Sequence, residues 1–183
     1  KRTKSFIIDS MSLIEKDNII KTIKLKLNKD LKIKDFNNLS INYVDDEDYK
    51  NSLKIFKQNN LFYLTGENFN ANQIIQNLID INDKNDLLSK DKFEFKIDIG
   101  ELVIDSEEKL KNFKGDLIIE KNSILKAKLS GNFIDDKKFK LSVNSDKKNK
   151  VTTLFVEKAK PIISRYKFIK GFEEGILDFN SEK

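Results

Sequence analysis

Residues 110–144 read LKNFKGDLIIEKNSILKAKLSGNFIDDKKFKLSVN, and this stretch decides the fold. Apolar and polar residues alternate in three consecutive runs, the period of a β-strand with one buried and one solvated face. The breaks at 121–123 and 135–137 are short and polar, as hairpin connections are. The stretch therefore predicts an antiparallel meander, apolar on one side and lysine-rich on the other. The apolar positions assigned to this face are Leu117, Ile119, Leu125, Leu129, Phe139 and Leu141.

The rest of the chain extends the same pattern. Two short apolar runs lie within residues 5–15. Alternation predicts strands over residues 19–28, 31–36, 39–44, 49–57, 61–66, 93–99, 102–104, 150–156 and 176–179. Gly100 separates two of these runs and indicates a bend or bulge, whereas Gly115 and Gly131 indicate sheet curvature.

Two segments change to a helical period. In residues 70–81 the apolar residues fall on one helical face, with Asn70 as N-cap and Gln73 in the capping-box position. Residues 156–166 predict a second helix, and Pro161 must lie in its first turn, because deeper inside it would cost about 3 kcal/mol. We expect a mainly β fold with two short helices (α+β), in which a long, curled, repeat-like antiparallel sheet forms an apolar groove. We expect residues 1–183 to be one β-rich segment of a longer chain, with a possible repeat boundary near 82–92.

The composition excludes several kinds of chemistry. The 183 residues contain no Cys and no His, which removes thiol nucleophiles, disulfides, imidazole bases and the commonest metal ligands. The net charge of +5 comes from Lys, with Arg only at Arg2 and Arg165, whereas nucleic-acid surfaces favour clustered Arg. We therefore expect no cofactor, no metal and no nucleic acid.

Carboxylate pairs are the remaining catalytic candidates. Glu107-Glu108 and Asp135-Asp136 fall in predicted turns, where ordinary solvation is the simpler interpretation than acid–base catalysis. The acidic turn 45–48 clusters carboxylates as calcium sites do, but it lacks the ligand spacing and central Gly of a calcium loop. The sequence therefore predicts that the chain is not an enzyme.

The apolar face is too large for two short helices to cover. It must meet a partner sheet, a neighbouring repeat or acyl chains. The 14 Phe residues fit either an ordinary core or the lining of a groove.

A family resemblance favours the groove. Residues 70–179 resemble the periplasmic domain of AsmA-like proteins, the large inner-membrane-anchored proteins of Gram-negative bacteria. The motifs are structural, and Glu174 replaces the first glycine of a pair that the family pattern contains. The positions that match the pattern are Gly115, Gly131, Ala159, Ile162, Ile163, Gly175 and Ile176.

The resemblance implies a function in the cell envelope. It implies a periplasmic segment, anchored to the inner membrane through other parts of the parent chain, that binds phospholipid acyl chains and conducts phospholipid between inner and outer membranes. An alternative is a structural or assembly factor of the envelope with envelope protein partners but no ligand of its own. A third hypothesis is a module that binds an acidic polymer through its lysine face.

Overall fold

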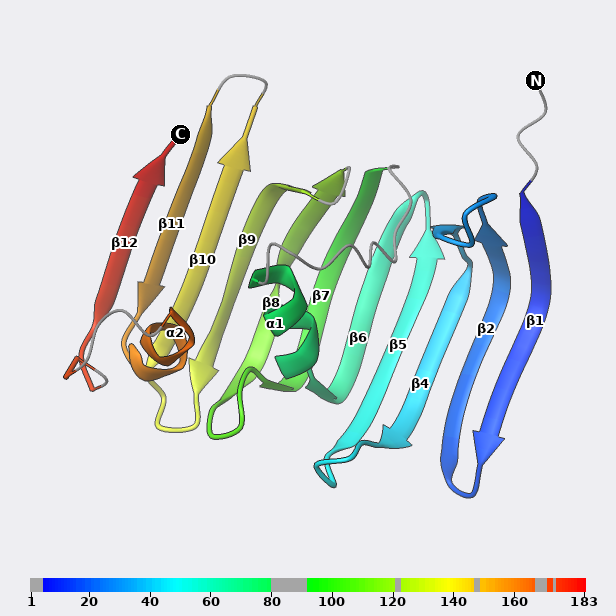
Figure 1. Ribbon diagram of the computed structural model, residues 1–183, viewed down its shortest axis with the longest axis horizontal. Coiled ribbons are helices and arrows are strands. Elements are labelled where there is room, and N and C mark those ends of the chain that lie inside the picture. Colours follow the sequence, from blue (N-terminus) through cyan, green and yellow to red (C-terminus); the bar gives the residue numbers. More distant parts are fainter. Residues whose placement is uncertain (1–4, 80–91, 121–122, 147–148, 167–170, 173) are drawn as a thin grey trace.

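The computed structural model describes residues 5–79, 92–120, 123–146, 149–166, 171–172 and 174–183. They form one 12-stranded sheet in the order β1-β2-β4-β5-β6-β7-β8-β9-β10-β11-β12, with β3 paired to β2 (Figure 1). The predicted mainly β fold with two short helices is confirmed. The repeat boundary expected at 82–92 lies, apart from Lys92, outside the described residues.

The elements follow the predicted order, and several are longer than expected. The strands are β1 Phe6–Glu15, β2 Asn18–Leu27, β3 Ile33–Asp35, β4 Asn38–Val44, β5 Lys50–Gln58, β6 Leu61–Asn70, β7 Lys92–Val103, β8 Lys109–Glu120, β9 Ser123–Phe133, β10 Lys138–Ser145, β11 Lys150–Val156 and β12 Leu177–Glu182, and the helices are α1 Asn72–Ile79 and α2 Lys160–Tyr166.

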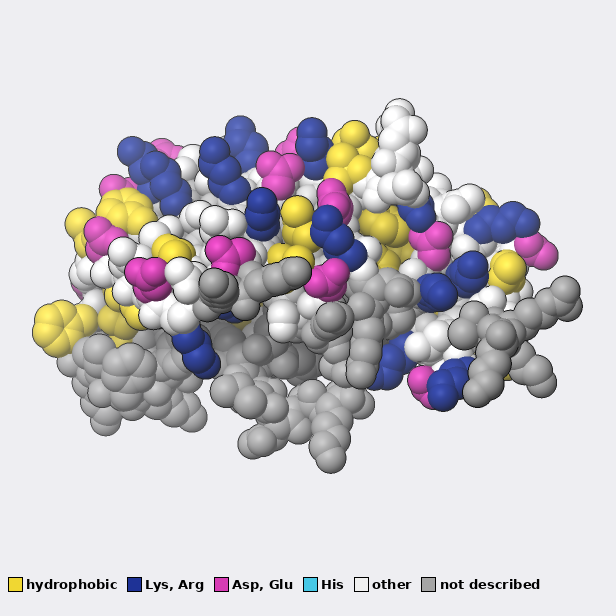
Figure 2. All heavy atoms as spheres, turned by 90° about the horizontal axis from the view of Figure 1, so that it is seen from above, with side chains coloured by type: hydrophobic (Ala, Val, Ile, Leu, Met, Phe, Trp, Pro, Cys, Tyr) yellow, Lys and Arg dark blue, Asp and Glu magenta, His cyan; other side chains and the backbone are white. Residues whose placement is uncertain are grey.

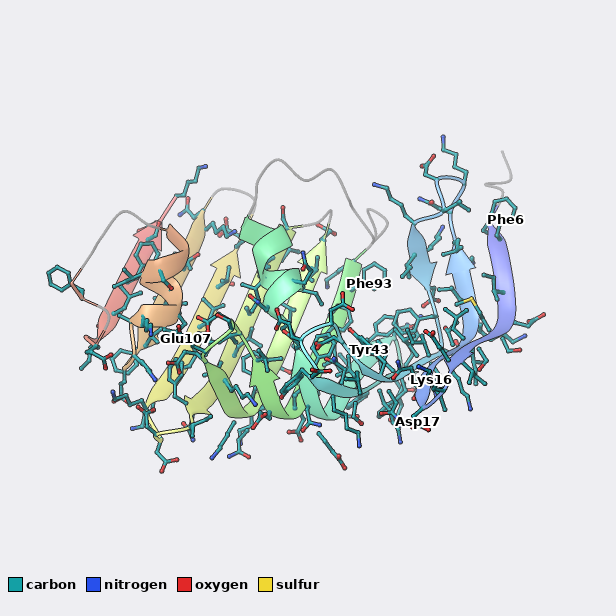
Figure 3. All side chains as sticks on the ribbon, turned by 60° about the horizontal axis from the view of Figure 1, so that its bottom comes forward. Phe6, Lys16, Asp17, Tyr43, Phe93 and Glu107 are labelled. Carbon is teal, nitrogen blue, oxygen red and sulfur yellow. The ribbon has the colours of Figure 1, made fainter. Side chains whose placement is uncertain are left out.

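Both helices lie over the same face of the sheet, near the same ends of the strands (Figures 1 and 3). The connection that contains α1 joins β6 to β7, the one parallel pair among the described strands, and parallel pairing requires such a crossover. Helix α2 begins later than predicted because residues up to Val156 pair in β11. Pro161 occupies its first turn, as expected.

The core lies between the helices and this face. Leu110, Phe133 and Val156 are completely buried, and Ile75 of α1 and Ile162 of α2 pack against their cluster. At the other ends of the strands, a second core cluster is formed by Phe36, Phe62 and Phe93. The face is therefore sealed where helices lie on it and has a separate aromatic cluster further along.

Strands β6, β7 and β8 keep one register with each other, but both outer strands of this group shift register against their other neighbours. Register shifts occur between β5 and β6 at Ser52/Leu53 and between β8 and β9 at Lys111/Lys114, whereas the β6–β7 and β7–β8 registers stay constant. In β7 the core residues accordingly step by three, from Ile99 to Leu102. The prediction of two strands separated at Gly100 is therefore wrong: β7 is continuous because its neighbours shift phase with it.

Strand β2 also departs from simple alternation. Thr22 lies opposite Leu39 and is 4% exposed, whereas Ile23 is 48% exposed. Lys24 has a φ of 54°, the left-handed region, and beyond it Leu25 packs on the second cluster. The alternation that predicts a strand over residues 19–28 also predicts that Ile23 and Leu25 share one face; this is wrong, because the backbone irregularity at Lys24 separates them.

Candidate functional site

One cross-strand row of side chains crosses the whole sheet on the helix-bearing face. In β7 to β12 the register places Ile97 opposite Gly115, Gly115 opposite Leu129, and Leu129 opposite Leu141, which lies opposite Leu154. The row continues in both directions, and its full sequence from β1 to β12 is Met11, Thr22, Leu39, Ile55, Leu64, Ile97, Gly115, Leu129, Leu141, Leu154 and Phe179. With about 4.8 Å between strands, such a row extends roughly 48 Å.

The predicted face residues lie on or beside this row. Leu117 lies opposite Phe95 and Ala127, and Ile119 lies opposite Phe93 and Ile124. Leu129 and Phe139 pack against the main core cluster. All six predicted residues are half-buried, unlike the completely buried residues beneath the helices.

Leu125 differs from the other five. The β8–β9 register shifts between Ile118 and Ile119, so that Ile124, and not Leu125, lies opposite Ile119. Leu125 is the extra residue of this β-bulge. The sequence pattern also failed to nominate Phe95 and Ile97 of β7, although the alternation in residues 93–99 carries the same signal.

The opposite face carries charges of both signs. Asp116 of β8 lies between Lys96 of β7 and Lys128 of β9, and Lys114 lies opposite Asp98. Lys and acidic side chains are also intermixed in the view from above, onto the upper ends of the strands in Figure 1 (Figure 2). Binding of an acidic polymer would require a basic surface, so this arrangement disfavours the third hypothesis.

A hydrogen-bonded cluster fixes the start of α1. The side chain of Asn51 is completely buried; its Nδ2 donates to Asp45 Oδ2 (3.1 Å), and its Oδ1 accepts from the backbone N of Asn70 (2.7 Å). Asn70 Nδ2 donates to Asp45 Oδ2 at 2.9 Å, and Asn70 Oδ1 accepts from the backbone N of Asn72 at 3.1 Å. The Asn70 side chain therefore caps the first N–H of the helix, but the first intrahelical bond runs from Ile75 N to Ala71 O, so the N-cap position is Ala71, one residue later than predicted. The backbone N–H of Asn70 donates to Asn51.

The ionisation of this cluster follows from its contacts. Burial alone would raise the pKa of Asp45, but hydrogen bonds from the backbone of Tyr49 and Glu47 and from the amides of Asn70 and Asn51 lower it overall. Asp45 therefore stays ionised at neutral pH.

A second polar group joins the β4–β5 turn to β7 and β8. The Tyr49 hydroxyl donates to Glu101 Oε1 (2.7 Å), and Lys109 Nζ lies 2.9 Å from the same oxygen. These bonds lower the pKa of Glu101, and burial together with Glu101 raises the pKa of Tyr49. The group is satisfied internally and has the character of a structural network.

The predicted carboxylate pairs lie in turns, and among the described residues three of their four carboxylates form ion pairs with Lys. Asp135 pairs with Lys137 at 3.4 Å, Glu107 pairs with Lys160, and Glu108 pairs with Lys158 at 2.5 Å. Within the described residues, no group of three or more acidic side chains is arranged to hold a metal ion, and no helix is long and apolar enough to cross a membrane. That the chain is not an enzyme stays a prediction.

A hollow of about 720 Å³ lies at the end of the sheet near the start of α1. Its walls come from β1, β2, β4, the β4–β5 turn and residues 70–73. Sequence reasoning did not predict it, because it depends on how the β1–β2 hairpin lies relative to α1.

Comparison with protein-family models, with curated proteins and with solved structures finds no match to this chain. The resemblance to AsmA-like proteins therefore stays a prediction.

Proposed function

We propose that the helix-bearing face binds phospholipid acyl chains, and that the chain is a segment of an AsmA-like periplasmic protein that conducts phospholipid between the inner and outer membranes. The observation that carries the proposal is the row from Met11 to Phe179, which keeps one side-chain face in register across the entire sheet. Except at Thr22 and Gly115, every residue of this row has an apolar side chain, so an acyl chain that moves from strand to strand stays in largely apolar surroundings.

The energetics suit a conduit. Each acyl methylene removed from water contributes about 0.8 kcal/mol, so a few methylenes give useful affinity without a polar site. Half-buried residues on and beside the row, such as Leu141 and Leu117, have apolar surface left for such contacts. A lipid can move along the row without a specific binding site for its headgroup.

Leu141→Asp tests the proposal, because Leu141 lies on the row and is half-buried. On a lipid-binding face, water reaches the carboxylate, so the variant folds but loses lipid. In a sealed core it would not fold, because an unpaired buried charge costs several kcal/mol. Leu129→Asp carries a greater risk of unfolding the chain, since Leu129 also packs against the core cluster.

The matched control is Ser142→Asp, which puts the same charge at an exposed position beside Leu141 on the opposite face. Co-purifying phospholipid is measured by native mass spectrometry, and contact by photocrosslinking. We expect lipid on the parent and on Ser142→Asp, and little on Leu141→Asp. A folded Leu141→Asp variant that crosslinks lipid as well as the parent contradicts the proposal. A parent without any lipid favours the structural or assembly factor.

A further inference from the structure

The hollow near α1 has an exposed apolar wall. Leu13 of β1 lines it and is 56% exposed; Ile14 and Val44 are also among the lining residues, but they follow Leu13 and Tyr43 in their strands, so their side chains point to the opposite face. Ile20 and Tyr43 continue the wall on the helix-bearing face, where Leu13 lies opposite Ile20 and Ile20 opposite Ile41. Large apolar side chains left exposed in one concavity are typical of a site whose ligand supplies the missing apolar contact.

The rest of the lining is anionic. Glu15, Asp45, Asp46 and Glu47 line the hollow, and no Lys or Arg does. Within the described part of the chain, the ion pairs include none to these four carboxylates. This uncompensated negative charge lies in a chain whose net charge is +5.

The negative charge beside the hollow affects the pKa of Tyr43. Burial, followed by the neighbouring charges of Asp45 and Asp46, raises the pKa of its phenol. Lys16 and Asp17, at the tip of the β1–β2 hairpin, are not part of the lining (Figure 3). The hollow thus combines an apolar wall with a negative potential that would attract a cation.

We infer that this hollow binds an amphipathic organic cation, an ammonium group that carries an alkyl chain. The ammonium lies among the carboxylates of Glu15, Asp46 and Glu47, and the chain covers Leu13, Ile20 and Tyr43. An aminophospholipid headgroup and a free alkylamine share this chemistry. The first source rests on the proposed function; the second does not.

The test compares ligands that differ in charge. Binding of dodecylammonium and of dodecanol to the full chain is measured by NMR titration, each below its critical micelle concentration. Dodecylammonium should bind about ten-fold more tightly, since two or three partly exposed charge contacts of about 0.5 kcal/mol each approach the roughly 1.4 kcal/mol that corresponds to that factor. The difference should shrink as salt is added, because exposed charges are screened.

The variant is Glu15→Gln/Asp46→Asn/Glu47→Gln, which keeps side-chain shape and removes three charges. Its control is Asp98→Asn/Glu120→Gln/Glu182→Gln, which removes as many charges from carboxylates that do not line the hollow. Circular dichroism checks that both fold. The first variant should lose the ten-fold preference for dodecylammonium and the control should keep it. Equal binding of dodecylammonium and dodecanol by the parent, or equal preference in the two variants, overturns the inference.

A second arm identifies the source. Short-chain phosphatidylethanolamine is compared with short-chain phosphatidylglycerol, both as monomers. A preference for phosphatidylethanolamine that the first variant loses supports a lipid headgroup; binding of dodecylammonium alone supports a free amine.

The Leu141→Asp variant separates this site from the proposed acyl-binding face, since Leu141 lies outside the lining of the hollow. If the Leu141→Asp variant loses phospholipid but still binds dodecylammonium, both the acyl-binding face and the cation site are supported. If the parent binds no phospholipid but still prefers dodecylammonium, only the proposed function fails.

Discussion

The carboxylate of Glu108, at the turn between β7 and β8, lies 2.5 Å from the Nζ atom of Lys158, just before α2. Both side chains are mostly buried, with 10% and 20% of their surface exposed. The neighbouring pair of Glu107 and Lys160 makes a parallel connection but is more exposed. Two adjacent ion pairs thus tie the end of the sheet to the start of the second helix.

Removing the buried charge of this pair should destabilise the fold. Glu108→Gln leaves Lys158 without its counter-charge in a poorly solvated place, and we expect a loss of about 2 kcal/mol in the free energy of unfolding. Glu107→Gln is the matched control and should cost less than about 1 kcal/mol, because its pair is solvated. Urea unfolding followed by circular dichroism measures both; equal losses would mean that burial does not distinguish the pairs.

Gly115 should tolerate no side chain. Its φ is 149°, and a Cβ atom there would lie 1.9 Å from the backbone oxygen of Lys128. Gly115→Ala should therefore lower the free energy of unfolding by about 2 kcal/mol or more. At Gly131 the nearest atom to a Cβ is the backbone oxygen of Lys111, at 3.3 Å, so Gly131→Ala should cost clearly less. Thermal unfolding of the two variants ranks them, and a reversed order would contradict the close approach of β8 and β9.

Alternation in the sequence was sufficient to predict most strands, but not which residues of each strand point to the core along its whole length. In β7 the step from Ile99 to Leu102 resembles a strand break, and only the matching shifts in β6 and β8 keep the strand intact. Register shifts are properties of several strands together, so a single strand's pattern does not contain them. The same limit applies to Ile23, whose exposure depends on the backbone of Lys24.

The candidate site was predictable to a similar degree. Leu129 lies opposite Leu141, and Leu117 lies on the same face opposite Ala127, because regular alternation and short hairpins fix the pairing of neighbouring strands. The burial of Asn51, by contrast, depends on contacts with Asp45 and Asn70, which come from different elements. A polar residue at an inward strand position gives no sign of which distant partners will satisfy it.

Asp45 should make stability sensitive to acid. Because hydrogen bonds hold the folded-state pKa of Asp45 below its ordinary value of 3.8, the stabilising contribution of Asp45 is complete above that pH and is lost as the pH falls through the folded-state pKa. Asp45→Asn should remove part of this pH dependence between about pH 5 and pH 2. It should also cost about 1–3 kcal/mol at neutral pH, since an amide cannot accept at both positions and the buried Asn51 amide loses a partner.

Asp46→Asn is the control for this change, because Asp46 is exposed. Chemical unfolding at a series of pH values measures the slope for both variants and the parent. A parent-like slope in Asp45→Asn would mean that Asp45 is not the group whose protonation destabilises the fold.

Proline substitutions should distinguish the edge strand β12 from the centre of the sheet. Lys150 and Lys183 exchange both backbone hydrogen bonds, at 2.7 and 3.0 Å. In an antiparallel pair bonded and non-bonded positions alternate, so Ser181, opposite Thr152, is bonded, and the N–H of Asn180 points away from β11. Asn180→Pro therefore removes no ladder bond and should be nearly neutral, whereas Ser181→Pro should cost about 1 kcal/mol. Leu129→Pro, between β8 and β10, should unfold the chain. Thermal unfolding compares the three, and a strongly destabilised Asn180→Pro variant would show that another strand pairs with the free edge of β12.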